Sequence, residues 1–364
     1  MKQFICFLVV FYSCSLLIAQ TEELTAEEKA YQDSINLLNE QNAVTAAGQE
    51  AYNEGINLFN EHKYEQSIKK FEIAINSNPN FTAAYYNKGI SENEALLFES
   101  AVQTFSKLLA IDNSYQKVYF QRARSYQGLN NFSMAESDYT KAIEFEPENP
   151  NTHYNFGTLK FLQKDYDGAI KLFTKTIELN GNKAYAYNDR GSCYRMKGEF
   201  EKAIKDYEQA SKLNPKLAFI INNLGTTKKK MGNFSGALND FNQAISVDNN
   251  FHLSYNNRGA TQMAMNRLDD ALNDFNKCLG ISPNYAPAYA NIAALKFKKE
   301  EYQAALESAN KAIELDPNYA SAYVNRGMIK EMLRDMKGAC EDWTKAKELG
   351  DESSKTYYSE NCGQ

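Results

Sequence analysis

The sequence predicts an all-α fold in which short helical hairpins stack one on another as an α-solenoid. Its composition, with 43% hydrophobic and 24% charged residues, is that of a chain that folds. It holds 24 Tyr and 21 Phe but only 7 Pro, which suits helices packed through aromatic side chains. The observation that decides the fold class is an internal period of 34 residues.

A small residue recurs at every 34th position. The series is Gly55, Gly89, Ala123, Gly157, Gly191, Gly225, Gly259, Ala293 and Gly327. When this residue is taken as position 8 of a unit, nine units fill residues 48–353, which is 306 residues without an insertion or deletion. The units begin at residues 48, 82, 116, 150, 184, 218, 252, 286 and 320.

Three other positions keep the same register and predict a helical hairpin in each unit. Position 20 is Ala in every unit except the first, which has Ser67, and position 24 is aromatic except at Ala309. Five of the seven prolines share position 32. Small residues at 8 and 20 let two helices approach closely, aromatic residues fill the space between units, and Pro ends the second helix.

The repeat resembles the tetratricopeptide repeat. The likeness is close in residues 187–191 and 323–327, Tyr-x-x-Arg-Gly, each followed by Ala-x-x-Asp-aromatic. The resemblance implies a right-handed superhelix with the first helix of each hairpin on its concave face. Because each repeat buries its apolar face only against its neighbours, the two ends need caps.

The N-terminal residues 1–19 have the order of a secretory signal peptide. Lys2 precedes an apolar run from Phe4 to Ile18, and Ala19 precedes a polar stretch. The run is shorter than the roughly 20 residues of a spanning helix, and cleavage is expected near Ala19. A permanent anchor and a lipid on Cys14 are the alternatives. The sequence therefore predicts export to a periplasmic or extracellular compartment.

Short segments flank the repeats as caps. Residues 20–47 are expected to form an N-terminal capping helix and residues 354–364 a C-terminal cap. Cys340 and Cys362 lie close in sequence at the C-terminal end and form the one plausible disulfide, whereas Cys193 and Cys278 are expected to be small buried residues.

No catalytic or metal-binding pattern is visible, so the sequence predicts a protein that is not an enzyme and has no cofactor, metal or small-molecule substrate. His62, His153 and His252 occupy different repeat positions and share no face with a Cys or carboxylate cluster. The glycines follow the repeat and do not form a phosphate loop. A net charge of −6 argues against a nucleic-acid partner.

Positions 7 and 23 are expected to meet as ion pairs inside a hairpin. The pairs are Arg122 with Asp138, Arg190 with Asp206, Arg258 with Asp274, and Arg326 with Asp342. The signs are exchanged at Glu54 and Lys70, and both positions are apolar at Phe156 and Leu172. We interpret these residues as structural, although a row of ligand-binding arginines is the alternative.

Lysines gather where two of the first helices end, at residues 228–230 and at Lys296, Lys298 and Lys299. They could attract an acidic partner, but solvated lysines are also favoured near the negative end of the helix dipole.

A row of amides at position 6 is the candidate binding site. It consists of Asn53, Asn87, Gln121, Asn155, Asp189, Asn223, Asn257, Asn291 and Asn325. A carboxamide offers a donor and an acceptor, so such a row can pair with the backbone of an extended peptide. It resembles the asparagine ladder of the long repeat domain in O-GlcNAc transferases. The alternative is that each amide bonds to a neighbouring helix.

Position 5 in the first four units carries Tyr52, Tyr86, Phe120 and Tyr154. If the position faces the groove, as the resemblance implies, these rings offer anchors for a partner. The alternative is ordinary packing between helices. The carboxylate clamp of co-chaperone members of the family, with Lys at position 5 and Asn at position 9, is absent.

The sequence therefore predicts an exported protein-binding scaffold that holds an extended peptide or a partner helix in its groove. An assembly factor or structural subunit of a cell-envelope complex, a non-catalytic regulator of an enzyme, and a structural spacer are the alternatives.

Overall fold

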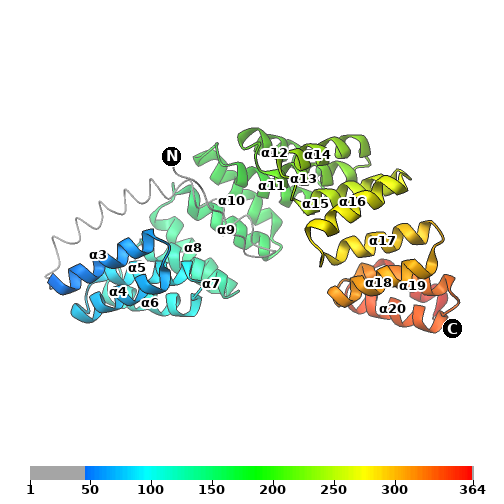
Figure 1. The fold of residues 1–364 in the computed structure, drawn as a ribbon. Helices are drawn as coiled ribbons and strands as arrows, with labels where there is room; N and C mark the ends of the chain where they lie inside the picture. The colour runs from blue at the N-terminus through cyan, green and yellow to red at the C-terminus, as the bar shows by residue number, and fades with distance from the viewer. Residues whose placement is uncertain (1–45, 363–364) are drawn as a thin grey trace. The chain divides into compact units, whose positions relative to one another are not determined.

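The computed structural model describes residues 46–362, and within that range all regular structure is helical (Figure 1). The predicted all-α fold of consecutively packed hairpins is confirmed. The predicted signal peptide, residues 1–19, and residues 20–45 of the predicted N-terminal cap lie outside the described residues.

Each first helix starts at or near position 1 of its 34-residue repeat. The first helices are α3 (Ala46–Asn60), α5 (Thr82–Glu94), α7 (Lys117–Gly128), α9 (Pro150–Leu162), α11 (Ala184–Met196), α13 (Ala218–Lys230), α15 (His252–Ala264), α17 (Ala286–Lys298) and α19 (Ala320–Met332).

Each second helix starts at position 17, usually on a Tyr or Phe. These are α4 (Tyr64–Ser77), α6 (Phe98–Ile111), α8 (Phe132–Phe145), α10 (Tyr166–Leu179), α12 (Phe200–Leu213), α14 (Phe234–Val247), α16 (Leu268–Ile281), α18 (Tyr302–Leu315) and α20 (Met336–Glu348). A last helix, α21 (Ser353–Asn361), lies at the place of the predicted C-terminal cap.

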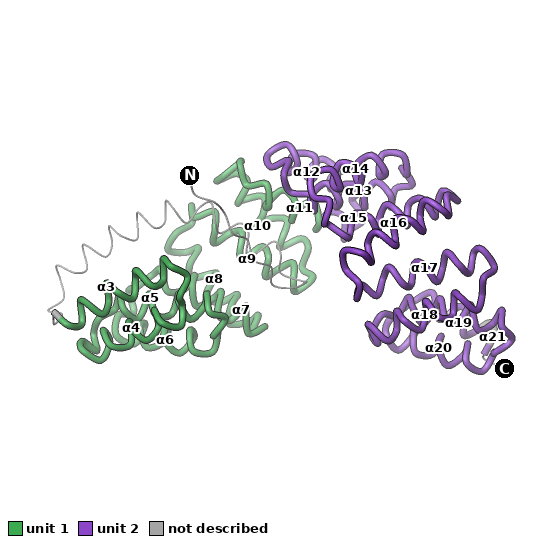
Figure 2. The backbone as a smooth tube through the Cα atoms, in the orientation of Figure 1, with its two compact units in different colours: residues 1–193 green, residues 194–364 purple. Residues whose placement is uncertain are grey.

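The chain forms two compact units, unit 1 ending at Cys193 and unit 2 beginning at Tyr194 (Figure 2). In each unit the second helix of one hairpin packs on the first helix of the next, as α4 does on α5 and α14 on α15. First helices also pack directly on one another: α3, α5, α7 and α9 follow in unit 1, and α13, α15, α17 and α19 in unit 2. They therefore form a continuous layer within each unit.

The turn inside each hairpin is set by a left-handed residue at position 15. Its φ is positive in all nine repeats, at His62, Leu96, Asn130, Lys164, Gly198, Gly232, Asn266, Glu300 and Arg334. In the second repeat the amide of Leu97 donates to the carbonyl of Glu92, and that of Leu96 to the carbonyl of Asn93. These two bonds make a Schellman motif, which satisfies carbonyls at the end of the first helix.

Within a hairpin, a glycine at position 8 faces the ring at position 24. A Cβ atom added at Gly225 would lie 2.8 Å from Cε1 of Phe241, and one at Gly89 would lie 2.4 Å from Cε1 of Phe105. Both rings are fully buried. Repeat eight departs from this pattern, with the small Ala293 and Ala309 at the two positions, both fully buried. In the repeats that have Gly at position 8, the two helices therefore pack through complementary residue sizes.

Candidate functional site

The position-6 amides form a ladder between neighbouring first helices. Nδ2 of Asn257 donates to Oδ1 of Asn222 at 3.0 Å, and Nδ2 of Asn291 donates to Oδ1 of Asn256 at 2.8 Å. Three more bonds share this 35-residue register: Asn87 Nδ2 to Tyr52 Oη at 2.7 Å, Asn325 Nδ2 to the Ala290 carbonyl at 3.1 Å, and Tyr154 Oη to Asp189 Oδ2 at 2.6 Å. Position 6 of one repeat thus bonds position 5 of the repeat before it.

Other members of the row bond locally. Oδ1 of Asn53 accepts from Gln49, Nδ2 of Asn155 donates to the carbonyl of Asn151, and Oε1 of Gln121 accepts from Arg124. The backbone carbonyl of Asn223 accepts from Oγ1 of Thr227. The alternative interpretation, that these side chains join neighbouring helices, therefore describes at least five of the nine positions.

The ladder leaves acceptors unused in unit 2. Oδ1 of Asn257, Asn291 and Asn325 accepts no hydrogen bond from any described residue, and all three side chains are only half-buried. The NH₂ group of each carboxamide donates to the preceding repeat and so fixes the side chain. The oxygen remains available to a donor from outside the protein. The arrangement can serve both packing and recognition.

Small residues lie beside these oxygens. Position 9, three residues further along the same helical face, is Thr226, Ala260 and Ala294 in repeats six to eight, and all three are half-buried. We call this surface, made of Asn257, Asn291 and Asn325 with Thr226, Ala260 and Ala294, the open face of unit 2. Position 9 of repeat nine carries the longer Met328, so a polypeptide backbone can approach most closely beside Asn257 and Asn291, which Ala260 and Ala294 follow on the same helical faces.

The equivalent surface of unit 1 is crossed by the protein's own charged side chains. Nη2 of Arg124 donates to Oε1 of Glu94 at 3.1 Å, and its Nη1 donates to Oε1 of Gln121 at 3.0 Å. Arg124 occupies position 9, where repeats six to eight of unit 2 have Thr or Ala and repeat nine has Met328. Unit 2 is therefore the better candidate for binding a segment on its first helices.

The expectation that position 5 offers aromatic anchors is wrong for three of its four residues. Tyr52, Tyr86 and Tyr154 are 0%, 7% and 4% exposed and belong to the apolar clusters of their repeats. Phe120 is half-buried and packs against Tyr139 at 6.2 Å between ring centroids. These rings contact neighbouring helices because position 5 turns toward the next repeat, so they cannot bind a partner without opening the core.

Asp189 is the one carboxylate in the amide row. Its Oδ2 accepts from Tyr154 and its Oδ1 accepts from Nδ2 of Asn188 at 2.9 Å. Burial raises the pKa of Asp189 to about 6, although both hydrogen bonds favour the charged form. This position therefore takes up a proton just below neutral pH.

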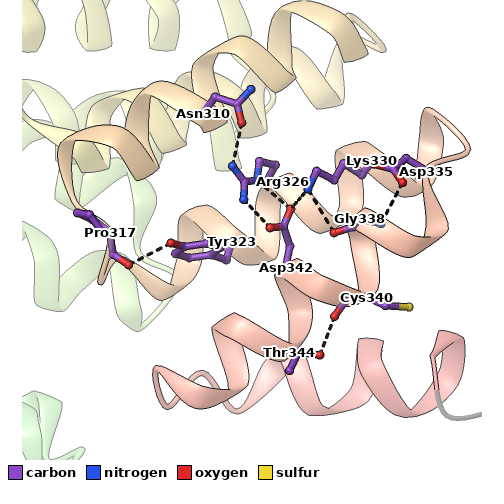
Figure 3. Close-up of polar contacts among 10 residues, drawn as sticks. All are labelled: Asn310, Pro317, Tyr323, Arg326, Lys330, Asp335, Gly338, Cys340, Asp342 and Thr344. Carbon is purple, nitrogen blue, oxygen red and sulfur yellow. Dashed lines mark hydrogen bonds and ion pairs between the residues drawn. The ribbon is translucent and has the colours of Figure 1, made fainter.

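Three of the predicted Arg–Asp pairs are present with paired hydrogen bonds. Nε and Nη2 of Arg326 donate to the two carboxylate oxygens of Asp342, while its Nη1 donates to Asn310 at 2.9 Å (Figure 3). Lys330 also bonds Asp342, at 2.9 Å. Arg122 with Asp138 and Arg258 with Asp274 have the same geometry. The sign-exchanged pair, Lys70 with Glu54, lies at 2.6 Å.

The third nitrogen of these arginines reaches the preceding repeat. Nη1 of Arg122, Arg190 and Arg258 donates to Ser106, Thr174 and Asn242, all at position 25. Position 25 was not predicted as a partner of these arginines, although Ser, Thr and Asn recur there one unit before each Arg. Arg190 and its predicted partner Asp206 belong to different units. The arginines thus hold hairpins together and are occupied by the protein itself.

Several of the clustered lysines are also used internally. Lys228 bonds Asp240 at 2.8 Å, Lys299 bonds Asp269 at 2.7 Å, and Lys296 bonds Oγ of Ser308 at 3.2 Å. Lys230 and Lys298 are exposed. The two runs are therefore mixed surfaces and not a continuous cationic patch.

Unit 2 also has a row of exposed methionines that was not predicted from the sequence. Met196, Met231, Met265 and Met332, at the ends of first helices, and Met336, at the start of α20, are 38–49% exposed. The signal was present as Met at position 13 or 14 of four repeats. Flexible methionines suit surfaces that contact other proteins.

The histidines lie apart, each with a local contact. Nδ1 of His62 is 2.9 Å from Tyr64 Oη, Nε2 of His153 is 2.8 Å from the carbonyl of Pro147, and His252 packs edge-on to Tyr285. The described residues contain no group of three or more His, Cys, Asp or Glu that could hold a metal ion. Among the same residues, no helix has the length and apolar character needed to span a membrane.

Comparisons with known proteins agree with this architecture. Models of the tetratricopeptide repeat match residues 52–115, 116–149, 184–217, 220–251, 252–285 and 286–319. The chain belongs to the tetratricopeptide repeat family. No curated protein matches it. The repeats support a role as a protein–protein interaction scaffold, and tetratricopeptide proteins are generally not catalytic.

Solved structures share the fold. A tetratricopeptide repeat protein from Parabacteroides merdae is 21% identical with a TM-score of 0.61, over 67% of this chain and 97% of the other. A chain of the APC/C hetero-tetramer Cut9–Hcn1 is 15% identical with a TM-score of 0.55, over 93% of this chain and 81% of the other. YrrB, described as a tetratricopeptide protein with an unusual peptide-binding site, is 27% identical with a TM-score of 0.40, over 50% and 95% of the two chains.

Proposed function

We propose that this tetratricopeptide protein is an exported scaffold that binds an extended segment of a partner protein on the open face of unit 2. The observation that carries the proposal is the set of unused oxygens on Asn257, Asn291 and Asn325, each held in place by its own bond to the preceding repeat. Ala260 and Ala294 leave room beside Asn257 and Asn291.

The spacing of these oxygens fits a peptide backbone. Packed helices lie about 8–10 Å apart, and a segment in the extended polyproline II conformation advances about 3.1 Å per residue with three residues per turn, so about every third peptide amide faces a repeat. Backbone bonds of this kind are independent of the side chains of the segment, which allows one surface to bind several sequences.

The test places bulky side chains on the open face of unit 2 and keeps the hydrogen bonds between the residues at positions 6 and 5. In the variant Ala260→Arg/Ala294→Arg, two long cations stand beside the amides while Asn222, Asn256 and their bonds remain. The matched control is Asn273→Arg/Asn276→Arg, on the exposed surface of the second helix α16. Circular dichroism establishes that both variants keep their helix content.

Affinity capture from an extract of the source cells, quantified by mass spectrometry, separates the outcomes. A partner bound by the wild type and the control but lost from the open-face variant supports the proposal. A partner kept by all three places the interface elsewhere, with the methionine row the next surface to change. Absence of any partner favours a structural spacer.

Export is the second part of the proposal, and it rests on the order of charged, apolar and small residues in residues 1–19. Mass spectrometry of the protein isolated from its source should find a chain that begins at Gln20. An intact N-terminus would contradict cleavage, and a lipid-sized mass increase would indicate modification at Cys14.

A further inference from the structure

The last helix, α21, is too short to be stable by itself. It has nine residues, Ser353–Asn361, whereas isolated helices shorter than about 12–15 residues are marginal in water. It packs on α20 at the end of the ninth repeat. Its position therefore depends on the contacts it makes there.

Packing supplies one of these contacts. The ring of Tyr357 stacks on Trp343 of α20, with 5.6 Å between centroids and 19° between planes. Tyr357 also packs against the apolar cluster of Tyr323, Val324 and Ala346. Trp343 is fully buried, so α21 closes the apolar end of the repeat.

The second contact that holds α21 is a disulfide bond. Cys340 on α20 is bonded to Cys362, which directly follows α21, and their Cα atoms are 5.7 Å apart. This agrees with the pair expected at the C-terminal cap. The bond fastens the far end of α21, while Tyr357 holds its middle.

The two sulfur atoms can be reached from solvent. Cys340 and Cys362 are half-buried and line an open hollow of about 450 Å³, whose other walls include Lys337, Lys345 and Tyr358. The side chains of Cys193 and Cys278 are instead fully buried, and burial raises the pKa of Cys278 to about 12. The terminal pair is therefore the one that a dissolved thiol can reach. The hollow also contains Glu341 and Glu348 beside the two lysines, and Lys345 bonds Glu348 at 3.3 Å, so its charges balance.

We propose that the Cys340–Cys362 disulfide is a redox latch: a dithiol reductant opens it, α21 leaves α20, and the apolar end of repeat nine around Trp343 becomes exposed. A thiolate of the dithiol attacks one sulfur, forms a mixed disulfide and releases the other cysteine as a thiolate, which takes a proton from water. The second thiol of the reductant closes on the first, so the reductant becomes a disulfide and both cysteines become thiols. Two electrons pass to the protein.

The chain contains a built-in probe for this change, because Trp343 is its only tryptophan. On addition of dithiothreitol, tryptophan emission should shift to longer wavelength and acrylamide quenching should increase several-fold. Far-UV circular dichroism should change only slightly, since nine helical residues are lost. Thiol labelling after unfolding should show a gain of two thiols, which establishes that reduction took place.

Two variants make the test decisive. Cys340→Ser/Cys362→Ser should show the red-shifted emission with or without dithiothreitol. Tyr357→Ala, which keeps the disulfide, should remain responsive to dithiothreitol but start from a less shielded Trp343.

Either of two results overturns the latch. Complete reduction with unchanged Trp343 emission and quenching would mean that packing alone holds α21. Loss of most of the helical signal on reduction would mean that the disulfide supports the whole fold.

Discussion

At the scale of single residues, the left-handed conformation at position 15 is maintained mostly without glycine. Leu96 adopts φ 60° and is 56% exposed, so it bears the steric cost of this conformation and contributes little packing. We expect Leu96→Gly to raise the free energy of unfolding by about 0.5–1 kcal/mol, after the greater chain entropy of glycine is deducted. Urea unfolding followed by circular dichroism measures the change.

The control for this substitution is the residue before it. Ala95 has φ −81°, a conformation that any residue adopts, so Ala95→Gly should lower stability. If both variants are destabilised equally, the left-handed turn does not limit the stability of the hairpin.

A second prediction concerns the contact between the glycine at position 8 and the ring at position 24. Gly225→Ala places a methyl group 2.8 Å from Phe241 and should destabilise by about 1–3 kcal/mol through overpacking. Gly280→Ala is the matched control, because nothing lies within 4 Å of its added Cβ and Ala is the better helix former. Thermal melts in which Gly225→Ala is neutral would refute the complementary sizes described above.

Protonation of the Asp189 carboxyl is expected to make the stability of the protein depend on pH. Its pKa is about 6 when folded against the ordinary 3.8, so the folded state holds its proton more tightly than the unfolded state. The stability that this proton confers is present below pH 3.8 and is lost as pH rises through 6.

Asp189→Asn, which gives position 6 the amide found in most other repeats, removes that loss. The variant should exceed the wild type by up to about 3 kcal/mol above pH 6, and the difference should shrink toward pH 4. Urea unfolding across this range tests it, and a constant difference at every pH would be inconsistent with titration of Asp189.

At the scale of elements, the Arg–Asp pairs join the two helices of a hairpin. Arg258 and Asp274 are mostly buried, with side chains 22% and 6% exposed. Removing one partner leaves the other desolvated and unpaired, so Arg258→Leu or Asp274→Leu alone should each cost about 1–3 kcal/mol.

Replacing both partners should cost less than the sum of the single changes. Repeat four already carries the apolar version, Phe156 with Leu172. A double-mutant cycle in urea measures the coupling, and strict additivity would show that the two side chains do not stabilise each other.

The packing of the first helices explains why the sequence predicted the row at position 6 but not the hydrogen-bond partners of its side chains. Its period placed the amides on one helical face, because residues 34 apart occupy equivalent positions in stacked hairpins. Which neighbour each amide bonds depends on the rotation of one first helix against the next. That rotation brings position 6 to position 5 of the preceding repeat, and it buries Tyr52 and Tyr154 in the core.

At the scale of the whole molecule, each hairpin contacts only its neighbours, so damage should stay local. Gly225→Ala should speed amide hydrogen exchange in α13–α16 and leave α3–α6 unchanged, because stability in such stacks passes through adjacent interfaces. Hydrogen exchange with mass spectrometry reads both regions in one experiment. Equal acceleration in α3–α6 would indicate one cooperative unit.

The sequence by itself determined the repeat length, the hairpin of helices in each repeat, the Arg–Asp partners and the terminal cysteine pair. The first three follow from local periodicity, which is set by helix geometry and residue size, and the cysteine pair follows from the closeness of Cys340 and Cys362 in the sequence. Only the tertiary structure decided which polar groups remain open to a partner, because that depends on how neighbouring hairpins share their hydrogen bonds. Asn257 and Tyr52 occupy adjacent repeat positions, yet one keeps a free oxygen at the surface and the other is enclosed in the core.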